Sequence, residues 1–154
     1  MDEKDVTYMR AALEEANKAK GKDEVPIGAV LVERESGEIV ARAHNLTRHL
    51  CDPTAHAEIT LIRERAKTVG AQRIPGHDLY VTLEPCPMCA AAISYARIDR
   101  VIFGALDQKS GGLSYVDGPN LYSKAAIHHK PEVTSGILAD ECGAIVTNFF
   151  RSKR

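Results

Sequence analysis

The sequence predicts an α/β fold of three layers, α/β/α, with a central mixed sheet of about five strands. Two observations predict it. Apolar residues switch repeatedly between strand and helix spacing along the chain, so strands and helices alternate. The first two predicted strands are joined at Ser36-Gly37, which predicts a hairpin and hence an antiparallel pair in the sheet. The length of 154 residues suits a single domain over residues 1–154.

Helices are predicted where apolar residues recur every three or four positions and a cap or breaker marks an end. Gly21 stops the first helix. Thr54 caps the second helix, which places His56 in its first turn. Pro87 can open the third helix, because its missing N–H costs nothing in a first turn. The predicted helices cover residues 5–20, 54–69, 87–95 and, from 137 or 139, the segment to 150.

Strands are predicted from short apolar runs bounded by turn residues. The run Asp78–Glu84 alternates, and Pro85 ends it. Residues 107–123 are rich in Gly, Ser, Asp, Pro and Asn, so we expect a long loop, and loops of this length are usually functional or mobile. The predicted strands are residues 27–33, 39–44, 78–84, 100–104 and a late extended piece at 132–135.

The charge balance limits how the chain can bind nucleic acid. The formal net charge is −1, so any RNA binding must come from a local patch. The best candidate is the segment from Phe149 to Arg154, where two aromatic residues stand beside cations. The alternative for this segment is a solubilising helix end in which Phe149 or Phe150 packs inward.

Four cysteines without an obvious disulfide pattern argue for a reducing compartment. Cys51 and Cys142 are then isolated thiols. The charged N-terminal residues do not resemble a secretory signal. The longest apolar run, Val25–Val32, is too short to span a bilayer. We therefore expect a cytoplasmic protein with no membrane contact.

A split motif carries the chemistry. His56 and Glu58 flank one alanine, and Cys86 and Cys89 follow about thirty residues later within Pro-Cys-Pro-Met-Cys. His and Cys are ligands that zinc prefers, and three protein ligands leave a fourth position open for water. Bound zinc makes that water acidic enough to yield hydroxide near neutral pH. A nearby carboxylate, Glu58, can then move protons. The same pair of motifs marks zinc-dependent nucleobase deaminases.

A structural zinc site is the alternative for the same residues. It would need a fourth protein ligand, and His44, His49 and Cys51 are the nearest in sequence. The cysteine pair alone could also be a redox pair.

With this motif and the stretches around it, the chain resembles the bacterial tRNA-specific adenosine deaminases, within the cytidine deaminase-like superfamily. The resemblance covers nearly the whole chain. It rests on the stretches 23–30, 44–45, 52–59, 79–89, 96–98, 103–105, 136–142 and 149–151.

The resemblance implies hydrolytic deamination of adenosine to inosine at the wobble position of a tRNA anticodon, a cytidine deaminase-like fold and a homodimer whose two subunits both touch RNA. It implies one Zn²⁺ per subunit and Glu58 as the proton shuttle. The implied ligands of zinc are His56, Cys86 and Cys89. The implied substrate contacts are Asn45 to the flipped base, Asp107 to the flanking nucleotide, and Phe149 and Arg151 to the RNA.

One segment, between Lys109 and His128, does not align cleanly with this family. Because this segment follows Asp107 almost directly, the resemblance supports the role of Asp107 less than it supports the roles of the other site residues. Two other functions stay open. A free-base or nucleoside deaminase acting on guanine or cytosine would share the metal site. A non-catalytic, zinc-stabilised RNA-binding module would keep zinc but make no use of Glu58.

Overall fold

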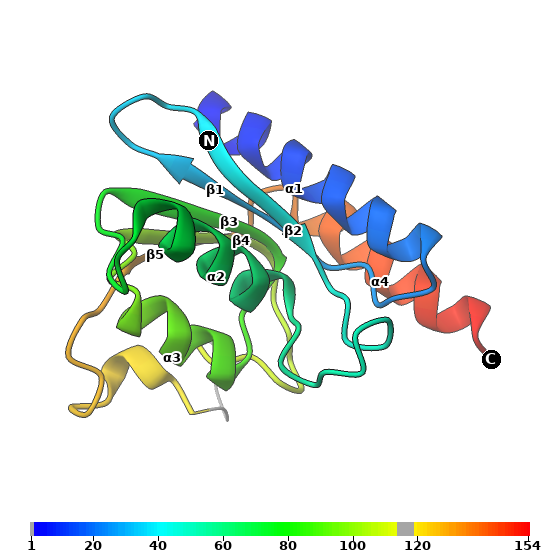
Figure 1. Cartoon of the computed structure of the whole chain (residues 1–154). Helices are drawn as coiled ribbons and strands as arrows, with labels where there is room; N and C mark the ends of the chain where they lie inside the picture. The colour runs from blue at the N-terminus through cyan, green and yellow to red at the C-terminus, as the bar shows by residue number, and fades with distance from the viewer. Residues whose placement is uncertain (1, 114–118) are drawn as a thin grey trace.

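The structure of the protein is a computed structural model that describes residues 2–113 and 119–154. Figure 1 shows the sheet between two helical layers, with α1 and α4 on one face and α2 and α3 on the other. This arrangement confirms the predicted three-layer fold with a mixed, five-stranded sheet. The elements are α1 (Glu3–Gly21), β1 (Gly28–Glu33), β2 (Ile39–His44), α2 (Ala57–Val69), β3 (His77–Leu83), α3 (Pro87–Tyr95), β4 (Arg100–Ala105), the 3₁₀ turn η1 (Leu121–Ser123), β5 (Glu132–Ser135) and α4 (Ala139–Ser152).

The strand order brings distant parts of the chain to one edge of the sheet. The order is β2-β1-β3-β4-β5, with β1 antiparallel to both neighbours and β3, β4 and β5 parallel. Leu83 at the end of β3 pairs with Ala105 at the end of β4, and Gly28 at the start of β1 pairs with His44 at the end of β2. The residues that follow β2, β3 and β4 therefore meet the residues that precede β1 at this edge.

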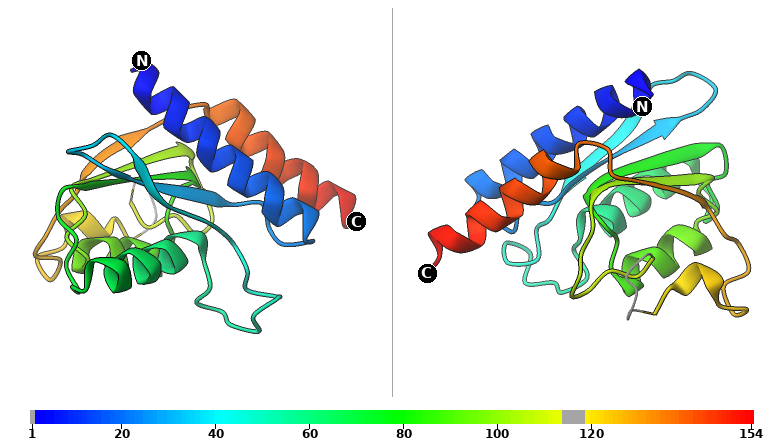
Figure 2. Two further views of the ribbon diagram at one scale, coloured as in Figure 1. Left: turned by 45° about the horizontal axis from the view of Figure 1, so that its top comes forward. Right: turned by 180° about the vertical axis from the view of Figure 1, so that it is seen from behind.

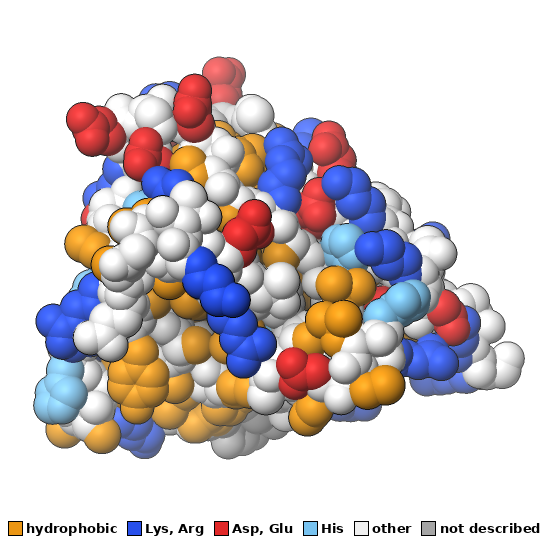
Figure 3. Space-filling view, in the orientation of Figure 1, with side chains coloured by type: hydrophobic (Ala, Val, Ile, Leu, Met, Phe, Trp, Pro, Cys, Tyr) orange, Lys and Arg blue, Asp and Glu red, His pale blue; other side chains and the backbone are white. Residues whose placement is uncertain are grey.

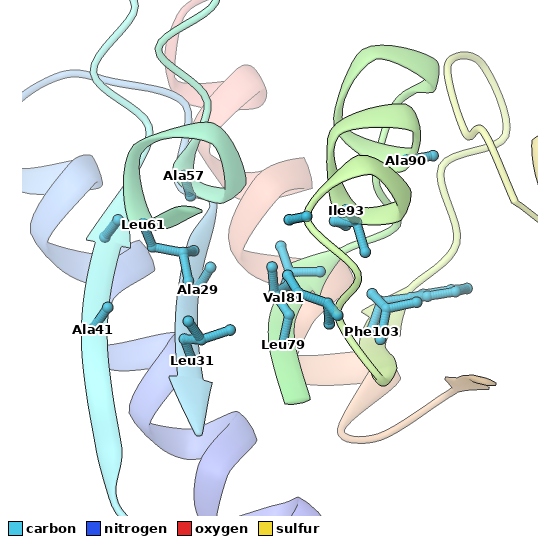
Figure 4. Close-up of a cluster of buried hydrophobic side chains, with 14 of the residues drawn as sticks. Ala29, Leu31, Ala41, Ala57, Leu61, Leu79, Val81, Ala90, Ile93 and Phe103 are labelled. Carbon is cyan, nitrogen blue, oxygen red and sulfur yellow. The ribbon is translucent and has the colours of Figure 1, made fainter. Parts of the chain in front are cut away.

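The core lies on both faces of the sheet, because successive side chains of a strand point to opposite faces. Ala29 and Leu31 of β1 belong to the cluster that packs under α2 and α3 (Figure 4). Val30 and Val32 belong to the cluster under α1 and α4. These two helices lie side by side in both views of Figure 2. Gly28 permits α1 to pack closely on β1, because a Cβ there would collide with the backbone of α1.

The predicted cap of the second helix is wrong. α2 begins at Ala57, and His56 is the N-cap residue rather than a member of the first turn. Thr54 is engaged elsewhere: its backbone N–H and its hydroxyl both donate to Asp52 Oδ1, at 2.9 and 2.7 Å. The first helix also begins earlier than predicted, because the Asp2 carboxylate accepts from the N–H of Lys4 and caps it.

The predicted long loop contains η1 at its end, and its residues 114–118 lie outside the described residues. Within the described ranges, no helix combines the length and the apolarity needed to cross a membrane.

Candidate active site

Two helix N-termini face each other at the edge of the sheet. His56 is the N-cap of α2 and Cys86 is the N-cap of α3, and both residues have extended backbone. Neither side chain makes a capping hydrogen bond. Cys89 lies in the first turn of α3, behind Pro87, which fills a first-turn position as predicted. The side chains of His56 and Cys86 are therefore both available to bind a common ligand.

The three predicted metal ligands lie together. Nδ1 of His56 is 3.6 Å from Sγ of Cys86 and 3.5 Å from Sγ of Cys89. The three ligand atoms all lie within 4.8 Å of one another. A tetrahedral zinc ion with ordinary Zn–N and Zn–S bond lengths separates nitrogen from sulfur by about 3.5 Å. The donor set and its spacing therefore fit zinc.

The charges at these ligands also favour a cation. Hydrogen bonding from Cys89 lowers the pKa of Cys86 to about 4 against the effect of burial, with a further contribution from His56. The Cys86 sulfur and burial raise the pKa of Cys89, because a second negative charge there would be repelled and poorly solvated. A divalent cation between the sulfurs removes that repulsion, so both can ligate as thiolates.

No fourth protein ligand completes this set among the described residues. Of the candidates for a structural site, His44 Nδ1 lies 3.3 Å from Glu15, and His49 Nδ1 lies 3.0 Å from Glu24. Cys51 is exposed. The observed set thus has the open position of a catalytic site rather than the closed shell of a structural one.

Glu58 lies beside the metal ligands in the first turn of α2. Its side chain is buried, and burial raises its pKa to about 7. It lines a cavity of about 220 Å³ together with His56. That volume is below the roughly 300–1,000 Å³ of pockets for drug-sized ligands, so it suits a ligand the size of one nucleobase. The remaining lining residues are Val25, Ile27, Asn45, Thr47 and Ala57.

Asn45 is buried on the wall of this cavity. Its backbone N–H donates to Ile27 O at 3.0 Å, and its Oδ1 accepts from the Thr47 N–H at 3.3 Å. Its Nδ2 donates to Val25 O at 3.5 Å. These bonds fix the orientation of the side-chain amide, which is what a group that recognises a base edge requires.

A larger cleft adjoins the small cavity, and Val25 and Ile27 line both. We call it the outer cleft. Its volume is about 1,010 Å³, and its walls are the segment after β4 and the outer side of α4. Its remaining lining residues are Leu83, Ala105, Leu106, Asp107, Gln108, Lys109, Ser110, Gly143, Val146, Thr147, Phe150, Arg151, Lys153 and Arg154. Aromatic, apolar and basic groups therefore meet next to the small cavity.

The predicted RNA contacts do not all lie in the same part of the structure. Asp107 and Arg151 both line the outer cleft. Asp107 Oδ1 also accepts from the N–H groups of Lys109 and Ser110, at 3.1 and 3.0 Å. Phe149 is buried and does not line the cleft, whereas its neighbour Phe150 is 48% exposed and does. The two rings meet edge to face at 5.5 Å, so Phe149 supports Phe150 from behind.

Two buried carboxylates beside the site escaped the sequence analysis. Glu24 accepts from the N–H groups of Arg48 and His49, at 3.2 and 2.8 Å. Glu84 directly precedes the cysteine motif and binds backbone N–H groups of the segment after β4. The only signal in the sequence is a glutamate at the end of an apolar run, which also fits an ordinary solvent-exposed strand end.

The fold and the ligand set define a zinc-binding deaminase domain. The family model for the cytidine and deoxycytidylate deaminase zinc-binding region matches residues 2–105. The tRNA-specific adenosine deaminase of Agrobacterium fabrum is 52% identical over 147 residues, which cover 96% of this chain and 94% of that protein.

Solved structures agree. A tRNA:A34 deaminase, studied for A-to-I editing at the wobble position of transfer RNA, is 51% identical and superposes with a TM-score of 0.85, over 90% of this chain and 98% of its own. A guanine deaminase from Bacillus subtilis is 37% identical, with a TM-score of 0.62, over 69% of this chain and 66% of its own. The chain belongs to the family of tRNA-specific adenosine deaminases, and it is a deaminase.

Proposed function

We propose that this deaminase converts adenosine to inosine at the wobble position of a tRNA anticodon. The observation that carries the proposal is the junction of two spaces: a base-sized cavity lined by Glu58 and Asn45, and an outer cleft lined by Phe150 and Arg151. Enzymes that act on a base within a strand take it out of the stack into a closed pocket. The flanking nucleotides then need stacking surfaces and cations outside that pocket.

One zinc ion per subunit is held by His56, Cys86 and Cys89. When bound, zinc supplies a Lewis acid that makes a coordinated water molecule acidic. The protein fixes the ligands on two rigid helix starts, whose dipoles favour thiolates. Cys86 is already ionised near neutral pH, so the protons that metal uptake would release come from Cys89 and from His56 Nδ1.

Glu58 acts as the proton shuttle. Its buried carboxyl has a pKa of about 7, so at neutral pH it can both accept and release a proton. It takes a proton from the attacking water, delivers it to a ring nitrogen of the adenine, and later protonates the departing amine. Because Glu58 lies on the wall of the small cavity, only a base that enters the cavity can reach it.

The remaining predicted contacts bind the RNA. Asn45 hydrogen-bonds the edge of the flipped base, and Asp107 contacts the flanking nucleotide. Arg151 neutralises phosphate, and Phe149 acts together with Phe150, the ring that lines the cleft. Two further cations, Arg48 and Lys153, both pair with Asp23, and Lys153 also lines the outer cleft. Figure 3 shows Lys, Arg and His side chains gathered at this end of the molecule.

The proposal includes a homodimer, residence in the cytoplasm and a single domain over residues 1–154. The family resemblance supports the dimer, and the four free cysteines support a reducing compartment. Sedimentation velocity at micromolar concentration tests the dimer directly, and a monomer under these conditions would contradict it.

The test of the function is deamination of an anticodon stem–loop with adenosine at the wobble position, assayed beside free adenosine, cytidine, cytosine and guanine. We expect inosine in the stem–loop and no turnover of the free compounds. Ammonia released only from a free base or nucleoside would keep the metal centre and reject the RNA substrate. Tight stem–loop binding without turnover, unchanged by Glu58→Ala, would identify a non-catalytic RNA-binding module.

A further inference from the structure

Glu84 connects the turn before α3, which carries the metal ligand Cys86, to the segment after β4, which lines the outer cleft. Its side chain is buried, although it is a carboxylate two positions before a metal ligand. Oε1 accepts from the N–H of Asp107 at 3.1 Å, and Oε2 accepts from the N–H of Leu113 at 3.0 Å. Each carboxylate oxygen therefore holds one end of the segment 107–113.

The segment 107–113 is folded tightly around this carboxylate. Gly111 lies so close that an added Cβ would be 2.5 Å from Cδ and Oε1 of Glu84. The Gly112 N–H donates to Pro85 O at 2.8 Å, which adds a backbone bond beside the two carboxylate bonds. The Gly111 N–H donates to Asp107 O at 3.0 Å and closes the turn. Only a residue without a side chain fits at position 111.

These contacts determine where Asp107 stands. Hydrogen bonds to an ionised carboxylate are shorter and roughly twice as strong as bonds between neutral groups, and a buried site strengthens them further. The backbone of Asp107 is therefore anchored to Glu84, while its own carboxylate organises Lys109 and Ser110. In the segment before β1, Glu24 holds the backbone of Arg48 and His49 in the same manner.

We propose that Glu84 is a positioning residue that fixes the segment 107–113 relative to the metal centre. Because Asp107 of this segment lines the outer cleft, Glu84 thereby sets how tightly the nucleotide beside the reacting base is held. The proposal rests on the proposed function for its substrate. Glu84 itself lines neither the small cavity nor the outer cleft, so it acts through the segment 107–113, whose Asp107 does line the cleft.

The first test measures the anchoring itself and does not depend on the substrate. Glu84→Gln keeps the shape of the side chain but places an amide NH₂ against one backbone N–H donor. Hydrogen exchange of the Asp107 and Leu113 amides, followed by NMR on the zinc-loaded protein, should speed up by about tenfold, which corresponds to about 1.4 kcal/mol. The Arg48 and His49 amides, held by Glu24, should be unchanged.

A second variant disturbs the same contact from the other side. Gly111→Ala puts a methyl group against the Glu84 carboxylate and changes no charge. It should give the same local exchange pattern as Glu84→Gln. The matched control is Asp5→Asn, which removes another buried carboxylate, bound to Arg100 and Tyr80 near the starts of the strands. It should lower stability without changing exchange at Asp107 and Leu113.

The kinetic test separates positioning from stability. With the anticodon stem–loop, Glu84→Gln and Gly111→Ala should raise KM by about tenfold and keep kcat within about twofold, because the metal centre is intact. Zinc content should stay at the wild-type level. Asp5→Asn should keep both KM and kcat.

The outcomes distinguish the two proposals. Faster exchange at Asp107 and Leu113 with an unchanged KM would overturn the positioning role, and so would a fall in kcat that parallels zinc loss. Unchanged exchange in both variants would overturn the anchoring. A wild-type protein that does not deaminate the stem–loop would reject the proposed function, while the exchange experiment would still decide the anchoring.

Discussion

The metal centre and the outer cleft lie at the same edge of the sheet but are built differently. The centre takes its three ligands from two helix starts, and each ligand belongs to a short motif. The outer cleft joins the segment after β4 to the last helix, about forty residues further on, and exposes Phe150 and Arg151. Under the proposed function the two regions divide the labour: the centre would perform the reaction, and the cleft would select the substrate.

Loss of a metal ligand should have the largest effect, because it removes both the reaction and part of the stability. Cys86→Ala should lose zinc and all measurable turnover. The free energy of unfolding should fall by about 4 kcal/mol, the stabilisation expected from a ligand present at a thousandfold its Kd. Metal analysis and urea unfolding check this prediction. A variant that kept full zinc occupancy would contradict the ligand assignment.

Removal of the proton shuttle should affect the reaction alone. Glu58→Gln keeps the size of the buried side chain, so zinc content and stem–loop affinity should stay close to wild type. The kcat should fall by about a thousandfold, the middle of the range for a general acid–base group. Single-turnover kinetics provide the measurement. Simultaneous loss of zinc would show that Glu58 supports the metal instead.

The two neighbouring phenylalanines offer a comparison within the outer cleft. Phe150→Ala removes an exposed stacking surface and should raise KM by about tenfold, since stacking of a base on an aromatic ring contributes roughly 1–3 kcal/mol. Phe149→Ala removes a buried ring and should instead cost about 3 kcal/mol of stability. Thermal unfolding and steady-state kinetics on both variants separate these effects. The reverse pattern would make Phe149 the direct contact.

The smallest effect on function should come from the buried ion pair near the starts of the strands. Burial raises the pKa of Asp5, but hydrogen bonds from Arg100 and Tyr80 outweigh it, so the pKa lies below its ordinary value of 3.8. The pair thus adds stability above pH 3.8 that is lost as the pH falls through the lower, folded pKa. Asp5→Asn should cost about 2 kcal/mol at pH 7. In urea unfolding, this difference from wild type should shrink below pH 3.8. A difference that stayed constant to pH 2 would contradict the shift.

The two regions also differ in how well the sequence predicts them. The mixed, roughly five-stranded sheet follows from alternating strands and helices and from the first hairpin, whereas its strand order comes only from the structure. The candidate metal ligands follow from their residue types and spacing, because a helix start fixes local geometry. Thr54 was misassigned as a cap because its competing partner, Asp52, is only two residues away and forms a turn. The burial of Glu84 and the exposure of Phe150 depend on packing between segments far apart in sequence, which the local sequence pattern does not encode.

The division of labour is tested most directly by comparing Glu58→Gln with Arg151→Ala on one anticodon stem–loop, measuring Kd as a function of salt and kcat at saturation. Glu58→Gln should bind with wild-type Kd and fail to turn over. Arg151→Ala should bind more weakly and keep its kcat. The magnitude of the slope of log K against log salt should fall by about 0.7, the value for the loss of one contact to a single-stranded phosphate. A large loss of affinity in Glu58→Gln, or of kcat in Arg151→Ala, would contradict the separation of reaction from recognition.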